Sequence, residues 1–158
     1  MRLALLAFVL LSISSRATGQ QCPEGFRYLG TLSGTGSESN PFDERVTVKF
    51  PANATFDESF QQKTVQATNG KSGARSNLRP QDIPKGVLVI AYGKEDKVYE
   101  PGWAVSDPEL RGIEQNGAGK ATRYEFGMKL FCTVSSHGQN PHFAECSVNA
   151  EVCYRPSR

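Results

Sequence analysis

Hydrophobic and polar residues alternate one by one over two long segments near the C-terminus. In Thr122–Ser135, the even-numbered residues are mostly apolar and the odd-numbered residues are mostly polar. The segment Phe143–Tyr154 repeats this alternation, again with apolar residues at even positions. A period of two over this length is typical of a β-strand that buries one face. Residues 136–141, between the two segments, are rich in turn formers, so we predict that the segments pair as an antiparallel hairpin.

Shorter patterns of the same kind occur earlier in the chain. Strands are predicted at Phe26–Leu32, 45–50, 86–92, 98–99 and 103–105. The run 86–92 is apolar throughout, which indicates a central strand covered on both faces. Residues 116–119 are expected to form a turn. Residues 56–68 fit a short helix and a strand equally well, and 33–41 and 69–84 are expected to be mobile surface loops.

These patterns predict an all-β fold. Several short strands separated by turns, with few helical signals, are typical of a single antiparallel β-sandwich or small barrel, here with a C-terminal hairpin. We find no internal repeat and no domain boundary after the N-terminal segment.

The first nineteen residues have the pattern of a secretory signal peptide. Arg2 is followed by the apolar run Leu3–Leu11, and Ala17 and Gly19 stand at the minus-three and minus-one positions of a cleavage site before Gln20. We therefore expect a signal peptide at 1–19 and a single domain at 20–158. The exported chain would be secreted or extracellular, or periplasmic if the source is a bacterium.

Cysteine spacing suggests how the exported chain is crosslinked. Cys22, Cys132, Cys146 and Cys153 remain after cleavage, and an even number favours two disulfides. If the C-terminal hairpin turns at Gln139, Cys132 and Cys146 lie opposite each other on the apolar face, where a disulfide can form. Cys153 has the opposite parity, so its remaining partner is Cys22. A turn shifted by one residue would break the first pairing.

Charge and hydropathy exclude several classes of partner. Two of the 18 basic residues, Arg2 and Arg16, lie in the predicted signal, which leaves 16 basic residues against 16 acidic ones. A net charge near zero argues against binding to nucleic acid or to anionic membranes. No long apolar run follows Leu11, so no membrane span is expected. Protein and carbohydrate partners stay open.

Two regions outside the regular strands are candidate ligand contacts. Tyr99 and Trp103 flank a tight turn and could stack on a sugar or anchor a protein if they were exposed. Burial of Trp103 in the core is the favoured interpretation. The second region is the basic loop 69–85, which could dock an acidic partner. Its candidate contact residues are Lys71, Arg75 and Arg79.

No motif indicates catalysis, a cofactor or a metal. The glycine-rich stretch 117–122 resembles a phosphate-binding loop only weakly, because Glu114 stands where the first glycine belongs and Ala121 where a Ser or Thr should follow the lysine. His137 and His142 lie in one loop, and with Glu145 they could form a metal site, but exposed loop histidines are the simpler interpretation.

Paired acids keep one enzyme class open. Glu100, Glu125, Glu145 and Glu151 lie on or beside predicted strands and could serve as the two carboxylates of a small glycosidase. The simpler interpretation is that they are charges on solvated strand faces.

The resulting hypothesis is an exported, disulfide-stabilised, non-catalytic binding module with an unknown ligand. A small secreted hydrolase and a structural component of an envelope or matrix are the alternatives. In a eukaryote, the sequon Asn53-Ala54-Thr55 would add a glycosylation site at Asn53.

Overall fold

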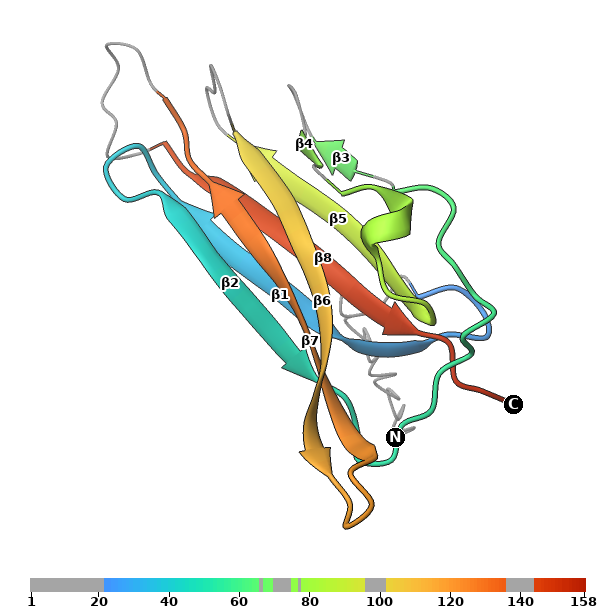
Figure 1. Ribbon diagram of the computed structural model, residues 1–158. Helices are drawn as coiled ribbons and strands as arrows, with labels where there is room; N and C mark the ends of the chain where they lie inside the picture. Colours follow the sequence, from blue (N-terminus) through green and yellow to red (C-terminus); the bar gives the residue numbers. More distant parts are fainter. Residues whose placement is uncertain (1–21, 66, 70–74, 77, 96–101, 136–143) are drawn as a thin grey trace, which may run out of the picture.

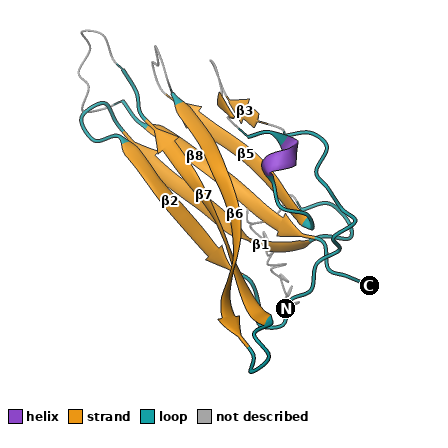
Figure 2. Ribbon diagram, viewed as in Figure 1, coloured by secondary structure: helices purple, strands orange, loops and turns teal. Residues whose placement is uncertain are grey.

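The computed structural model describes residues 22–65, 67–69, 75–76, 78–95, 102–135 and 144–158, and the predicted signal peptide lies outside them. The described residues form strands and one short 3-10 helix (Figures 1 and 2). The strands are β1 (Arg27–Gly36), β2 (Phe42–Lys49), β3 (Ala67–Asn69), β4 (Arg75–Ser76), β5 (Val87–Glu95), β6 (Trp103–Gln115), β7 (Ala121–Cys132) and β8 (Cys146–Tyr154), and the helix η1 spans Pro80–Asp82. Within these residues, no helix has the length and apolar character needed to cross a membrane.

The strands form two four-stranded sheets, as the all-β sandwich prediction requires. Sheet A has the order β1-β8-β5-β3, and sheet B has the order β2-β7-β6-β4. The long strands pair in antiparallel fashion, and β3 and β4 each add a short parallel edge strand. The two sheets face each other (Figure 1).

The core fills the space between the sheets. Even-numbered residues of β7 and β8 point inward, as their alternation predicted, and contribute fully buried side chains to one cluster with β5 and β6. At one end of the sandwich, an aromatic group closes this core: Phe56 makes edge-to-face contacts with Phe50, Tyr124 and Tyr154. The inward faces were therefore predictable from the period of two.

The predicted C-terminal hairpin is wrong, although both of its strands exist. β7 pairs with β2 and β6 in sheet B, whereas β8 pairs with β1 and β5 in sheet A. The chain crosses from one sheet to the other between them. An alternating pattern shows which face of a strand is buried but not which strand lies beside it, and this is why the pairing was missed.

Both predicted disulfides are confirmed. Cys132 bonds to Cys146 with a Cα–Cα distance of 5.6 Å, and Cys22 bonds to Cys153 with a Cα–Cα distance of 5.9 Å. Because β7 and β8 belong to different sheets, Cys132–Cys146 joins the two layers rather than two neighbouring strands. The described residues contain no free cysteine, and two disulfides are typical of a protein that folds in an oxidising compartment.

The first strand is longer than predicted. β1 continues to Gly36, through residues that were expected to form a surface loop. Gly34 and Gly36 occupy inward positions, where a Cβ would overlap the Phe42 ring and the Cys132 carbonyl respectively. Because glycine replaces the apolar residue at these positions, the alternation of the strand is invisible in the sequence.

β6 was also recognised only in part, at residues 103–105. It extends to Gln115 and contains a bulge at Asp107 and Pro108, where its pairing with β7 shifts. Asp107 has a φ of 51°, and proline cannot donate to a strand ladder, so this segment does not have the usual sequence of a strand. The predicted turn after β6 is confirmed: the Asn116 side chain accepts hydrogen bonds from the Ala118 and Lys120 amides, each at 3.0 Å.

Candidate binding surfaces

The turn that contains Tyr99 and Trp103 is only partly described. Trp103 is 0% exposed, and a Cβ at Gly93 would overlap its indole ring, so Trp103 is a core residue with no surface for a ligand. Tyr99 and Glu100 lie outside the described residues. Trp103 is therefore buried, which is the interpretation that the sequence favoured.

The basic loop is also described in part. Lys71, His137 and His142 lie outside the described residues, and Arg75 belongs to β4. Arg79 lies next to η1, and its guanidinium donates two hydrogen bonds of 2.9 Å to Asp82. These bonds raise the pKa of Arg79 and lower the pKa of Asp82. Part of the charge of Arg79 is thus balanced locally by its own neighbour.

Two of the candidate carboxylates, Glu125 and Glu151, lie on opposite outer faces of the sandwich. Glu125 is on the outer face of sheet B, where Arg111 binds it at 2.7 Å. The hydrogen bond to Glu125 raises the pKa of Arg111. Glu151 is on the outer face of sheet A and is 1% exposed, and Glu145 is exposed just before β8. The core separates Glu125 from Glu151, so these two acids cannot flank one bond. Among the described residues, no three histidine, cysteine or acidic side chains group as a metal site would require.

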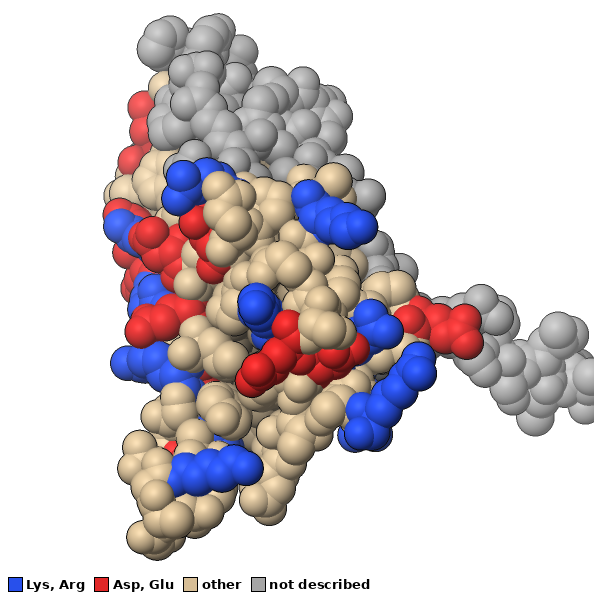
Figure 3. Space-filling view, turned by 45° about the vertical axis from the view of Figure 1, so that its right-hand side comes forward, with Lys and Arg blue, Asp and Glu red and all other residues tan. Residues whose placement is uncertain are grey.

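The outer face of sheet B is covered by ion pairs among its strands β2, β6 and β7. The pairs, with their nitrogen–oxygen distances, are Asp43–Lys129 (3.2 Å), Arg45–Glu109 (2.8 Å), Glu125–Arg111 (2.7 Å) and Glu114–Arg123 (3.0 Å). Arg45 extends over Gly127, which has no side chain, and also donates to the Asp107 carbonyl at the bulge of β6. Figure 3 shows acidic and basic side chains intermixed rather than gathered in a patch of one sign. Such a face is a solvated surface.

The outer face of sheet A has a different chemistry. On the edge strand β1, Thr31, Ser33 and Thr35 point outward and are exposed. They lie opposite Glu151, Asn149 and Ser147 of β8, which in turn lie opposite Ile90, Tyr92 and Lys94 of β5. Hydroxyl and amide groups predominate on this face, and only Lys94 and the buried Glu151 carry charge among these nine positions.

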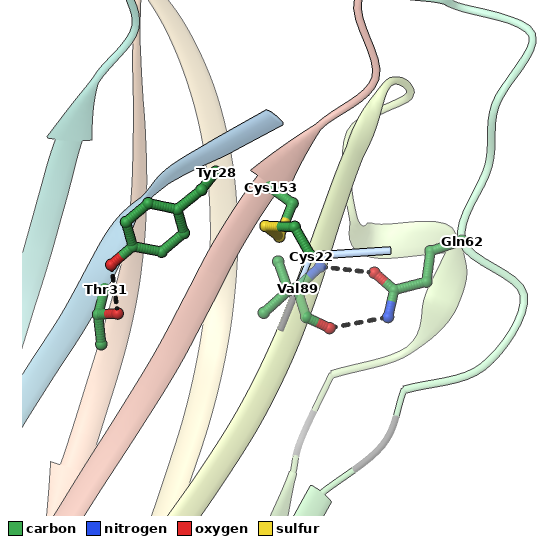
Figure 4. The surroundings of a disulfide bond; sticks show 6 residues. All are labelled: Cys22, Tyr28, Thr31, Gln62, Val89 and Cys153. Carbon is green, nitrogen blue, oxygen red and sulfur yellow. Dashed lines mark hydrogen bonds between the residues drawn. A yellow bond between two sulfur atoms is a disulfide. The ribbon is translucent and has the colours of Figure 1, made fainter. Parts of the chain in front are cut away.

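Two tyrosines flank the buried carboxylate of sheet A. Tyr28 is 39% exposed and shares a 2.8 Å hydrogen bond between its hydroxyl and Thr31 (Figure 4). Tyr92 is half-buried, and its pKa is raised by burial, by Glu151 and by Tyr28, in that order. Thr31, which shares the hydrogen bond with Tyr28, lies opposite Glu151, and Tyr92 lies opposite Asn149, two positions along β8 from Glu151. The Cys22–Cys153 disulfide holds the chain near this end of β1 (Figure 4).

A hollow lies at the opposite end of the sandwich from the β1–β2 turn. Its volume is about 370 Å³, within the range of about 300–1,000 Å³ that is typical of small-ligand sites. It is formed by the segment 53–58, by the turn between β6 and β7, and by the first residues of β7. The half-buried rings of Phe56 and Tyr124 line it, and Asn53 is at its rim.

Of the candidate ligand contacts that the structure describes, Trp103 is in the core, Arg75 is in β4 of sheet B and Arg79 is beside η1, so none of these three lies on the sheet A face or in the hollow. The sheet A face was missed because the second half of β1, residues 33–36, was expected to be a loop. The regular spacing of Thr31, Ser33 and Thr35, with Leu32 and Gly34 between them, was the signal that could have shown it.

Comparison with known proteins adds no assignment. No family model, no curated protein and no solved structure matches this chain.

Proposed function

We propose that this protein is an exported binding module that holds a neutral carbohydrate chain against the outer face of sheet A. The observation that carries the proposal is the contrast between the two outer faces. Ion pairs cover sheet B, whereas sheet A carries exposed hydroxyls, an amide and two tyrosines with little charge. The predicted signal peptide and the two disulfides support export.

The groups on this face suit the chemistry of sugars. Ser and Thr hydroxyls donate and accept hydrogen bonds, and the Asn149 amide does both as well, which matches the mixed donors and acceptors of a sugar. The C–H face of a sugar ring is apolar and packs on an aromatic ring such as Tyr28. Exposed tyrosine together with Ser and Asn is also a composition that favours recognition at low entropic cost.

The shape of the face favours a polymer over a single small molecule. Outward positions repeat every ~6.8 Å along a strand and every ~4.8 Å between strands. Three consecutive positions on each of β1, β8 and β5 therefore make an extended surface rather than a closed pocket. A neutral chain also avoids the desolvation of charge that an ionic ligand would require.

The test is binding to a panel of insoluble neutral polysaccharides, namely cellulose, chitin, β-1,3-glucan and starch, with alginate as an acidic comparison. We expect at least one neutral polymer to retain the protein. Tyr28→Ala should weaken this binding about tenfold, which corresponds to about 1.4 kcal/mol. Ile113→Ala is the matched control, because Ile113 is similarly exposed at 37% but lies on the hairpin of sheet B.

A second pair of variants tests the face without removing an aromatic ring. Ser33 and Thr47 are both exposed outward positions on edge strands, one in each sheet. Ser33→Lys should abolish binding, whereas Thr47→Lys should leave it unchanged. Retention of none of the neutral polymers, or equal loss in both members of a pair, would exclude the proposal.

The hydrolase alternative receives less support. A glycosidase needs two carboxyl groups about 5–10 Å apart across the scissile bond. Glu125 is bound by Arg111 on one outer face, and Glu151 is buried on the other. Binding without cleavage is therefore the function that we put forward.

A further inference from the structure

The sequon and the hollow coincide in space. Asn53 and Thr55 are both exposed, and both line the hollow together with Phe56 and Tyr124. Asn53 has a φ of 58°, a conformation that asparagine tolerates better than most residues. Its backbone amide donates to the Thr122 carbonyl at 2.6 Å. Among the described residues, no hydrogen bond engages its side-chain amide.

The C-terminal residues hold the segment that carries the sequon in place. The C-terminal residues run beside it: the Asp57 amide donates to the Arg155 carbonyl at 2.9 Å, and the Ser157 amide donates to the Thr55 carbonyl at 3.3 Å. The Asp57 carboxylate binds Arg155 at 3.2 Å. The hollow is therefore preformed, and a group attached to Asn53 would contact the rings of Phe56 and Tyr124, which line it.

We propose that Asn53 carries an N-linked glycan when the chain passes through a secretory pathway that makes such glycans, and that the first sugar of this glycan occupies the hollow. The proposal is independent of the function proposed for the sheet A face. It assigns the hollow to the protein's own modification rather than to a free ligand.

The covalent step is a transfer from a lipid-linked oligosaccharide. The Asn53 amide nitrogen forms a bond to C1 of the first sugar, and the bond between C1 and the pyrophosphate oxygen breaks. The lipid pyrophosphate leaves with the electron pair, and the amide nitrogen loses one proton to a base of the transferase. The hydroxyl of Thr55 completes the acceptor sequence.

The surroundings of Asn53 explain why the sugar should settle there. The apolar face of the sugar can cover Phe56 and Tyr124, whose rings stand edge to face with centroids 5.0 Å apart. Lys120 and Glu58 at the rim supply polar partners for its hydroxyls. Covering two half-buried rings removes apolar surface from water, so the attached sugar should stabilise the fold.

The full chain, secreted from a eukaryotic host, provides the test. Intact mass before and after an endoglycosidase that leaves one sugar should show a single occupied site. Thr55→Ala should lose the glycan, and Thr55→Ser should keep it. Thr55→Ala is the better unglycosylated reference, because Asn53→Gln would also strain a left-handed residue. The one-sugar protein should melt a few degrees above Thr55→Ala.

A glycan moved to another site tests whether stabilisation requires the sugar to lie in the hollow or follows from any attached sugar. Ser37→Asn with Ser39→Thr, placed in the Thr55→Ala background, creates a sequon in the turn between β1 and β2, at the opposite end of the sandwich. When its glycan is trimmed to one sugar, this variant should have the same melting temperature as its unglycosylated form. No glycan on Asn53, no gain in melting temperature, or an equal gain from the relocated sugar would each overturn the proposal.

Discussion

Two aromatic residues, Trp103 and Tyr28, have opposite roles that follow from their surroundings. Trp103 is wholly enclosed, and its indole N–H has no hydrogen-bond partner among the described residues, so packing alone fixes it. Tyr28 keeps 39% of its surface exposed and anchors its hydroxyl on Thr31. At the scale of single residues, the first should determine stability and the second should determine recognition.

Truncation of each ring measures this difference. Trp103→Ala should lower the free energy of unfolding by about 3–5 kcal/mol, because it removes a large buried side chain and leaves a cavity. Tyr28→Ala should change it by less than about 1 kcal/mol, since the ring is partly solvated and the hydrogen bond is at the surface. Urea denaturation of both variants is the measurement. A Trp103→Ala protein as stable as the parent would contradict the burial of this residue.

Tyr92 gives the sheet A face a dependence on alkaline pH. Its pKa is raised above the ordinary value of about 10, chiefly by burial and then by Glu151 and Tyr28. The fold thus favours the neutral phenol. This contribution to stability is fully present below the unfolded pKa and is lost as pH rises through the folded pKa. Tyr92→Phe cannot ionise, so unfolding measured from pH 8 to pH 11 should show a smaller alkaline loss than in the parent.

At the scale of elements, the alternation of residues predicted strands and buried faces but not partners. The even positions of β7 and β8 are buried as expected, and the two strands nevertheless belong to different sheets. Where an inward position holds glycine, as at Gly34, the pattern itself disappeared. The sheet A face could not be assembled from the sequence, because it combines three strands whose order only the fold defines.

The turn between β6 and β7 offers a test of backbone conformation, because it contains a control glycine two residues away. Gly119 has a φ of 76°, and neither Gly117 nor Gly119 has a neighbour that a Cβ would meet. Gly119→Ala should cost about 1–2 kcal/mol because an L-residue is strained in the left-handed region. Gly117→Ala should be neutral or stabilise by up to about 1 kcal/mol, since it restricts the unfolded chain. Thermal denaturation decides, and equal effects would contradict the turn.

At the scale of the whole molecule, one disulfide joins the two sheets, and the other joins the segment before β1 to the last strand. Cys132–Cys146 ties sheet A to sheet B across 14 positions of sequence, and Cys22–Cys153 ties the N-terminal segment to the last strand across 131 positions. The disulfide pairing was predictable from the number of cysteines and from their even or odd positions. The geometry assumed for Cys132–Cys146, a hairpin, was not the one found. Cys132 and Cys146 do face each other, but across the core rather than along a hairpin.

Loop length predicts that the two crosslinks differ in their effect on stability. In the chain-entropy model, a closure of 131 positions is worth about 4–5 kcal/mol, and a closure of 14 positions about 3 kcal/mol. Cys22→Ala with Cys153→Ala should therefore destabilise more than Cys132→Ala with Cys146→Ala. Loss of the shorter loop has one additional cost. Both of its cysteines are fully buried, so their truncation to alanine also leaves small cavities that destabilise the fold. Guanidinium denaturation of the two double variants gives the order. If the inter-sheet pair had the larger effect, cohesion of the two layers, rather than restriction of the unfolded chain, would be the main contribution of the disulfides to this fold.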